Sequence, residues 1–218
     1  MNFSHLLLCS VPEKEKLLEY GFCQQGDIFV LKKNLDNEFY AVVEYQPDSL
    51  NVQVFEIETD EKYALLDVKK ARGAFVNGIR SKVSDLVSNI VENCFESADL
   101  KLQYIEWLES YLKTKGDYPW EDKENFAVYR CSNSKWFALV MRIKFKNLGF
   151  ESDEPVWVVN LKADAEKIPV LVDKKSIFPA WHMNKKYWIT VVLTAVTDFE
   201  KLKELTLRSK QLVEKSKK

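Results

Sequence analysis

The chain has 218 residues, of which 46% are hydrophobic and 13% aromatic, and its net charge is −1. This length allows one large domain or two of about 100 residues, and the aromatic content excludes a disordered chain. The apolar runs are too short to cross a bilayer. Charged residues from Glu13 to Lys16 closely follow the apolar run from Leu6 to Cys9, so no signal peptide is expected. We therefore expect a cytoplasmic protein without membrane contact.

The charge is distributed unevenly along the chain. Residues 1–96 hold ten basic and sixteen acidic side chains, whereas residues 97–218 hold twenty-two and seventeen. This asymmetry indicates two separately built domains, 1–96 and 97–218, and the second would meet a polyanion first.

The first half predicts a helix, an antiparallel meander and a second helix. The first helix follows Pro12 and is stopped by Gly21. The second, from Ser81 to Phe95, carries apolar residues at helical spacing. Short stretches bounded by turn residues predict strands at Ile28–Leu31, Phe39–Tyr45, Asn51–Glu58 and Tyr63–Val68.

The second half follows the same order, although no residue-level repeat links the two halves. Its first helix, capped by Ser97 or Asp99, runs to Lys115. The apolar face of that helix holds Leu102, Ile105, Leu108 and Leu112. The later elements expected are strands Phe126–Tyr129, Lys135–Phe145, Val156–Leu161 and Trp188–Val196, and helices Ala163–Val172 and Asp198–Lys215. The predicted fold class is α+β, with two domains that each have an antiparallel sheet and helices packed on one face.

Motifs for nucleotide binding, metalloprotease or serine hydrolase chemistry are missing from the sequence. The four cysteines are widely spaced, which favours reduced thiols over a zinc site. The acidic run from Glu56 to Glu61 could bind a hard cation, although such runs are usually a solvated surface. We expect no catalytic residue, no cofactor and no metal site. The enzymatic alternative would use His182 as a general base.

The most informative segment runs from Ile177 to Ile189 and concentrates Pro, His, Asn, two Lys and two Trp before an apolar strand. One interpretation places its polar side chains on a turn, facing solvent as a donor-rich surface. In the other, His182 and Asn184 bond to loop backbone and hold the turn, while Trp181 and Trp188 fill the core.

This segment resembles the hallmark of the MmcQ/YjbR family, in which a proline is followed by an aromatic residue, His-Met-Asn-Lys, a second basic residue and Trp. The matching residues are Pro179, Trp181, His182, Met183, Asn184, Lys185, Lys186 and Trp188, with Trp181 where tyrosine is common and Tyr187 where histidine is common. Further matches at Pro119-Trp120, Lys135–Ala138 and Leu161-Lys162 extend the resemblance over residues 97–218.

The resemblance implies a CyaY-like (frataxin-like) fold for residues 97–218 and a DNA-binding role. Residues 1–96 look like the N-terminal extension of some members. Frataxin relatives bind iron through an acidic first helix. Here Asp99, Glu106 and Glu109 are offset by lysines in the corresponding helix, so iron binding is not expected.

Basic residues of the second half could contact phosphates. Arg142, Lys144 and Lys146 alternate with apolar residues, which predicts three cations on one strand face. Binding through phosphates would be salt-dependent and without sequence preference, although lysines on a strand also protect a sheet edge. The candidate nucleic-acid-binding residues are Arg142, Lys144, Lys146, Lys174, Lys175, His182, Asn184, Lys185 and Lys186.

Two binding functions therefore remain besides the enzymatic alternative. The first is a non-enzymatic module that binds double-stranded DNA, with the 1–96 domain regulating, dimerising or recruiting. The second is a protein-interaction or small-ligand module. Its recognition surface would be Phe178, Trp181, Tyr187 and Trp188.

Overall fold

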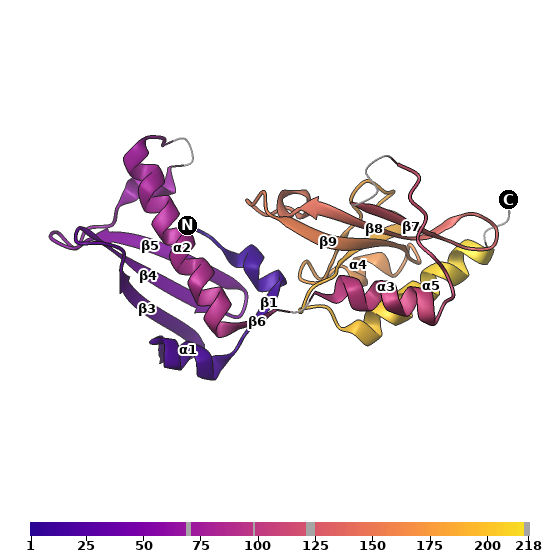
Figure 1. Ribbon diagram of the computed structural model, residues 1–218, viewed down its shortest axis with the longest axis horizontal. Helices are drawn as coiled ribbons and strands as arrows, with labels where there is room; N and C mark the ends of the chain where they lie inside the picture. The colour runs from indigo at the N-terminus through magenta and orange to yellow at the C-terminus, as the bar shows by residue number, and fades with distance from the viewer. Residues whose placement is uncertain (69–70, 98, 121–124, 216–218) are drawn as a thin grey trace. The chain divides into compact units, whose positions relative to one another are not determined.

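In a computed structural model the chain divides into two compact units, Met1–Ser97 and Ala98–Lys218 (Figure 1). Residues 1–68, 71–97, 99–120 and 125–215 are described by the structure. Each unit has an antiparallel sheet with helices on one face, so the predicted α+β class is confirmed. In the described part of the chain, no helix is long and apolar enough to cross a membrane.

The N-terminal unit is a four-stranded meander covered by two helices (Figure 1). Its strands pair antiparallel in the order β2 (Cys23–Gln25), β3 (Ile28–Asn34), β4 (Phe39–Gln46) and β5 (Ser49–Glu56). Its helices are α1 (Lys14–Tyr20), α2 (Ala74–Cys94) and the 3-10 helices η1 (Ser4–Leu8) and η2 (Ala64–Asp67). A separate two-stranded sheet joins β1 (Ser10–Pro12) to β6 (Phe95–Ser97).

Helical periodicity decides the length of α2. The helix begins at Ala74 rather than at the expected Ser81, because Val76 and Ile79 extend the buried stripe that continues through Val83. As expected, α1 is stopped by Gly21, which caps the helix after Tyr20 with a φ of +114°, a left-handed conformation that glycine adopts without strain.

The strand predicted over Tyr63–Val68 is wrong. The amide of Tyr63 still donates to the carbonyl of Val54, but the chain then tightens into η2. The ring of Tyr63 packs edge-on against Phe39, and Leu66 is buried in the core. A single turn therefore fills this corner of the core where a further strand was expected.

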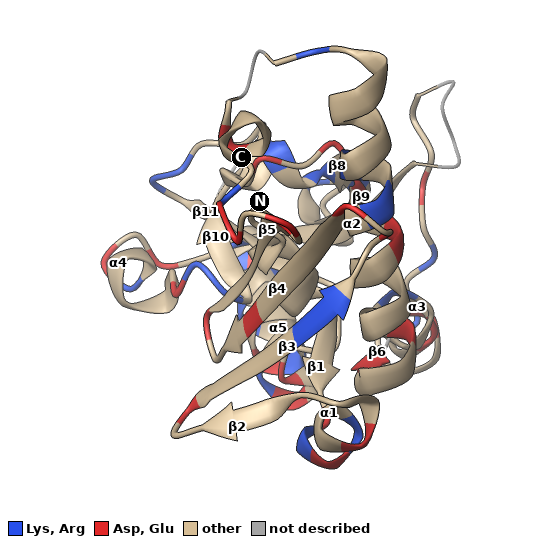
Figure 2. Cartoon of the chain, turned by 90° about the vertical axis from the view of Figure 1, so that its left-hand side faces the viewer, with Lys and Arg blue, Asp and Glu red and all other residues tan. Residues whose placement is uncertain are grey.

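Both signs of charge are mixed over the N-terminal unit. Figure 2 shows basic and acidic residues together on α1, basic residues on β3 and an acidic one on β4. The acids of the run from Glu56 to Glu61 serve the turn after β5, where Asp60 accepts a hydrogen bond from Tyr40 and Glu56 accepts one from Thr59. Among the described residues, no cluster of His, Cys, Asp or Glu is arranged to hold a metal.

The C-terminal unit is built on a five-stranded antiparallel sheet (Figure 1). The order is β10 (Ile177–Pro179), β11 (Trp188–Val192), β9 (Pro155–Lys162), β8 (Trp136–Lys144) and β7 (Phe126–Arg130). The helices are α3 (Leu100–Ser110), α4 (Ile168–Leu171), α5 (Phe199–Lys215) and the 3-10 helix η3 (Phe145–Leu148).

Helices α3 and α5 cover one face of this sheet (Figure 1). Alternate strand residues point into that layer, and the side chains buried there include Tyr129, Val140, Val159, Leu161 and Ile189. In α5, the Ser209 hydroxyl donates to the carbonyl of Phe137 and accepts from the amide of Lys162. This buried polar contact fixes the helix to the ends of two strands.

Helix α3 differs from its expected form. It ends at Ser110 rather than at Lys115, and the positive φ of +51° at Lys113 is incompatible with a helix that continues to Lys115. The sheet side of α3 is formed by Leu100, Tyr104 and Leu108, which leaves Leu102 on the opposite side and 68% exposed.

Other boundaries in this unit are also shorter than expected. The helix expected over Ala163–Val172 shrinks to α4, and β11 ends at Val192, whose carbonyl accepts a bond from the Thr197 hydroxyl. Strand β10 is an element that the sequence interpretation lacked, although its residues Ile177 and Phe178 are buried.

Candidate functional site

The segment between β10 and β11, residues 180–187, forms the motif loop, and a closed hydrogen-bond network holds its beginning. The amide of Trp181 donates to Oγ1 of Thr190 over 2.9 Å, and this hydroxyl donates to Oδ1 of Asn160 over 2.5 Å. Nδ2 of Asn160 donates back to the carbonyl of Trp181 over 2.7 Å. Both Asn160 and Thr190 are fully buried, so the network is shielded from water.

Asn184 holds the second half of the motif loop. Its Oδ1 accepts from the amide of Lys186, and its carbonyl accepts from the amides of Tyr187 and Trp188. The carbonyl of Tyr187 accepts in turn from the amide of Ala163, after β9. The interpretation in which Asn184 holds the turn therefore describes this residue, and the loop is anchored at both ends.

The motif loop presents its basic side chains to solvent. His182 is exposed at a φ of +58°, and its ring centroid lies 3.7 Å from that of Trp181. Lys185 and Lys186 are exposed, and Lys186 Nζ lies 5.3 Å from the ring centroid of Tyr187. Within the described ranges neither lysine has an acidic partner. Their charges are thus available to an anion.

A pocket of about 560 Å³ opens beneath the motif loop. Asn184, Tyr187 and Trp188 form one side, and the turn after β9 and Leu212 of α5 form the other. Asp164 in that turn is held by two hydrogen bonds of 2.7 and 2.9 Å from Arg208. The guanidinium keeps the pKa of Asp164 below its ordinary value, so the carboxylate stays ionised at neutral pH.

The three cations expected on one face of β8 do not all lie on a strand. Arg142 and Lys144 are exposed on β8, but Lys146 belongs to η3. The strand ends because Phe145 is buried against Phe150 and the chain reverses through η3. The alternation of basic and apolar residues continues past the end of β8, so the prediction that Lys146 lies on the strand was wrong.

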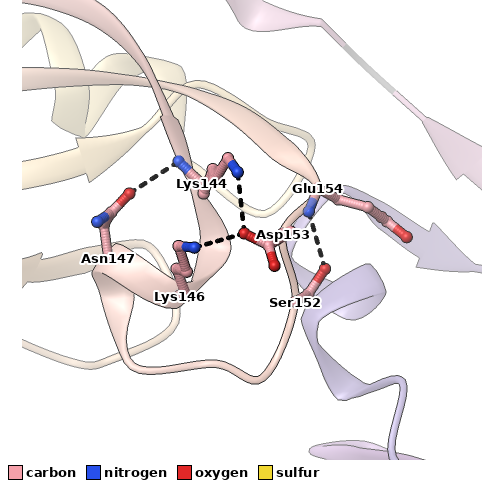
Figure 3. Close-up of polar contacts among 6 residues, drawn as sticks. All are labelled: Lys144, Lys146, Asn147, Ser152, Asp153 and Glu154. Carbon is pink, nitrogen blue, oxygen red and sulfur yellow. Dashed lines mark hydrogen bonds and ion pairs between the residues drawn. The ribbon is translucent and has the colours of Figure 1, made fainter. Parts of the chain in front are cut away.

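Lys144 and Lys146 share one acidic partner (Figure 3). Their Nζ atoms lie 3.0 and 2.6 Å from Oδ1 of Asp153. Lys146 and Lys144 together hold the pKa of Asp153 below its ordinary value. This carboxylate therefore offsets part of the positive charge at this end of the sheet.

Lys174 and Lys175 lie in a turn before β10 that Asp173 organises. Oδ1 of Asp173 accepts from the amides of Lys175, Ser176 and Ile177, each over 2.8 Å. Burial alone would raise the pKa of Asp173, but these hydrogen bonds and one from the Ser176 hydroxyl outweigh it, so the pKa lies below its ordinary value.

Asp173 should make stability depend on pH. Because its pKa is lower in the folded than in the unfolded chain, its contribution is complete above about pH 4 and is lost as the pH falls through the folded pKa. Asp173→Ala is expected to make the fall in unfolding free energy between about pH 5 and pH 3 shallower, as measured by urea unfolding. Glu106→Ala, on the exposed side of α3, is the control, and an unchanged slope for Asp173→Ala would contradict the assignment.

The strand register separates the candidate cations into two groups. Trp188 pairs with Lys162, so the motif loop lies at the end of the sheet where Ala138 pairs with Leu161. Lys144 lies at the far end of β8, about 20 Å away along the strand. Lys174 and Lys175 precede Ile177 and so lie toward that far end as well. One continuous patch does not form: His182, Asn184, Lys185 and Lys186 lie together on the motif loop, whereas Lys144 and Lys146 lie together beside Asp153.

The aromatic surface expected for a recognition module is also divided. Phe178 is 2% exposed and belongs to the core, whereas Trp181 and Trp188 are half-buried and Tyr187 is exposed. Sequence reasoning missed Asn160. Its signal was a single amide within the apolar strand segment Val158–Leu161, which requires buried partners.

Comparisons with known proteins point to the C-terminal unit. A family model described as YjbR matches residues 110–212. A protein of Bacillus subtilis (strain 168), described as uncharacterized protein YyaQ, is 38% identical over 81 residues, which are 37% of this chain and 69% of that protein.

Two solved structures that are similar to the chain come from different bacteria. A crystal structure of a Pseudomonas syringae protein is 38% identical, with 52% of this chain and 97% of that chain covered and a TM-score of 0.49. A crystal structure of a Deinococcus radiodurans protein with a DUF419 domain is 25% identical, with 54% and 81% covered and a TM-score of 0.42.

Proposed function

The chain belongs to the YjbR family, and from this premise we propose that its C-terminal unit is a non-enzymatic, cytoplasmic module that binds double-stranded DNA through the motif loop. Lys185 and Lys186 would contact backbone phosphates, and His182 would lie beside them. Such contacts carry charge but no base information, so the module would bind DNA with little sequence preference.

The observation that carries this proposal is the contrast between the two groups of lysines. Lys185 and Lys186 project from a loop fixed at both ends and have no acidic partner among the described residues. Lys144 and Lys146 are both within 3.0 Å of Asp153. A fixed loop loses little conformational freedom on binding, which favours it as the contact element.

The test compares two double variants of the full chain. Lys185→Ala/Lys186→Ala is expected to weaken binding to a fluorescently labelled duplex about tenfold and to reduce the slope of log K against log salt by about 2. Fluorescence anisotropy over a salt series measures both quantities.

Lys144→Ala/Lys146→Ala is the matched control, because it removes the same charge from the opposite end of the sheet. We expect it to change the affinity less than about twofold, since Asp153 already offsets part of that charge. Equal effects of the two variants would assign binding to the overall charge rather than to the motif loop. No binding by the unmodified chain at low salt would refute the proposal.

Small-ligand binding is a second candidate, favoured by the pocket beneath the motif loop. Leu212→Trp would fill that pocket from the α5 side without changing the charge of the loop. The Leu212→Trp variant should no longer bind a ligand in this pocket, whereas the affinity of the variant for DNA should be unchanged. The enzymatic alternative would require an acid or a nucleophile within hydrogen-bond reach of His182.

A further inference from the structure

A second concave site lies on the helix-covered face of the C-terminal sheet, away from the motif loop. This site, the α3 groove, has a volume of about 340 Å³ and is lined by residues that include Lys101, Ile105, Tyr118, Ala127, Val140 and Trp157. Its size is within the range of small-molecule pockets.

The register of the sheet explains why the groove is open. Ala127 pairs with Val140, and the bridge between Asp117 and Val128 brings Tyr118 alongside that pair. The small side chains of Ala127 and Val140 form a low floor beneath the first turns of α3. The next residue of β7 on the same face is the large, fully buried Tyr129, which packs in the core beneath the helices.

Trp157 lines the groove and has two cations as neighbours. Lys101 Nζ is 4.1 Å from the centroid of the Trp157 ring. Arg142 is its cross-strand partner, so the two side chains stand on the same face of the sheet. Both cations are without an acidic partner among the described residues. Two uncompensated charges beside an apolar floor complement a ligand that is apolar at one end and anionic at the other.

We propose that the α3 groove binds small aromatic carboxylates. The flat ring would lie over Ala127 and Val140, and the carboxylate would reach Lys101 and Arg142 beside Trp157. This role is separate from the motif loop, because the register places Arg142 near the opposite end of the sheet from Trp188.

The test uses 2-naphthoate as the probe and its uncharged amide, 2-naphthamide, as the matched control. Titration of the ¹⁵N-labelled full chain should give saturable shifts at Ala127, Val140 and Trp157. The dissociation constant is expected to be below about 1 mM, and the amide should bind at least about tenfold more weakly. Equal binding of acid and amide, or shifts confined to other residues, would overturn the proposal.

Variants separate the charge from the shape of the groove. Lys101→Ala/Arg142→Ala is expected to weaken naphthoate binding about tenfold with little change for the amide. Ala127→Leu should exclude both probes by filling the floor. Lys185→Ala/Lys186→Ala should leave naphthoate binding unchanged, so failure of the DNA proposal would be distinguishable from failure of this one. Full binding by Lys101→Ala/Arg142→Ala would refute the assigned site.

Discussion

Asn160→Ala is expected to lower the unfolding free energy of the C-terminal unit by about 3–4 kcal/mol. The substitution removes a fully buried amide, leaves the carbonyl of Trp181 and the hydroxyl of Thr190 without the bonds they now make, and opens a cavity. All six tryptophans lie after residue 98, so urea unfolding followed by tryptophan fluorescence reports on this unit alone.

The network also predicts how neighbouring substitutions combine. Thr190→Ser keeps the hydroxyl and should cost only about 1 kcal/mol for the lost methyl group. Thr190→Val removes the hydroxyl, and its cost should add only in part to that of Asn160→Ala, because both variants lose the bond between Thr190 and Asn160. Gln103→Ala, at an exposed amide on α3 of the same unit, is the surface control. A loss below about 1 kcal/mol for Asn160→Ala would show that the network contributes little.

Two buried tyrosines should change the stability in opposite directions when each is replaced by phenylalanine. The unfolding free energies of the two variants are expected to differ by about 2 kcal/mol. The hydroxyl of Tyr104 lies 2.8 Å from that of Thr206, which itself donates to the carbonyl of Leu202, so Tyr104 is the donor. Tyr104→Phe removes this bond and should cost about 1 kcal/mol. The Tyr129 hydroxyl is buried with no hydrogen-bond partner in the described structure. Tyr129→Phe should therefore stabilise the unit by up to about 1 kcal/mol.

Both phenols carry no charge at the pH of this comparison. Burial raises the pKa of both phenols, so both remain neutral through neutral pH and the comparison is free of charge effects. Urea unfolding of the single variants at one pH measures the difference. A destabilised Tyr129→Phe would indicate that its hydroxyl has a partner, such as a bound water.

Local patterns predicted most elements of the fold but not their ends. Helical spacing indicated α2 and α5, and alternation with turn residues indicated β3, β4 and β5. The ends depend on packing with distant residues. Phe145 leaves the line of β8 to meet Phe150, and Leu66 enters the core as part of a 3-10 turn. Neither contact is encoded in the spacing of apolar residues.

The candidate site shows the same division between local and distant information. The composition of residues 177–189 indicated a structured loop with exposed lysines, and the structure has one. The pairing of Lys144 and Lys146 with Asp153, and the distance of both from the motif loop, depend on strand order. A linear sequence shows that basic residues are numerous, but only the register shows which of them lie together.

The pairing of β1 with β6 bears on how the N-terminal unit is made. Ser10 pairs with Ser97, so the last residues of the unit are needed to complete a sheet that its first residues begin. During synthesis the unit can therefore reach its final form only after residue 97 has left the ribosome. Its first and last strands are paired with each other, so the two ends of the segment 10–97 lie next to one another in the folded unit.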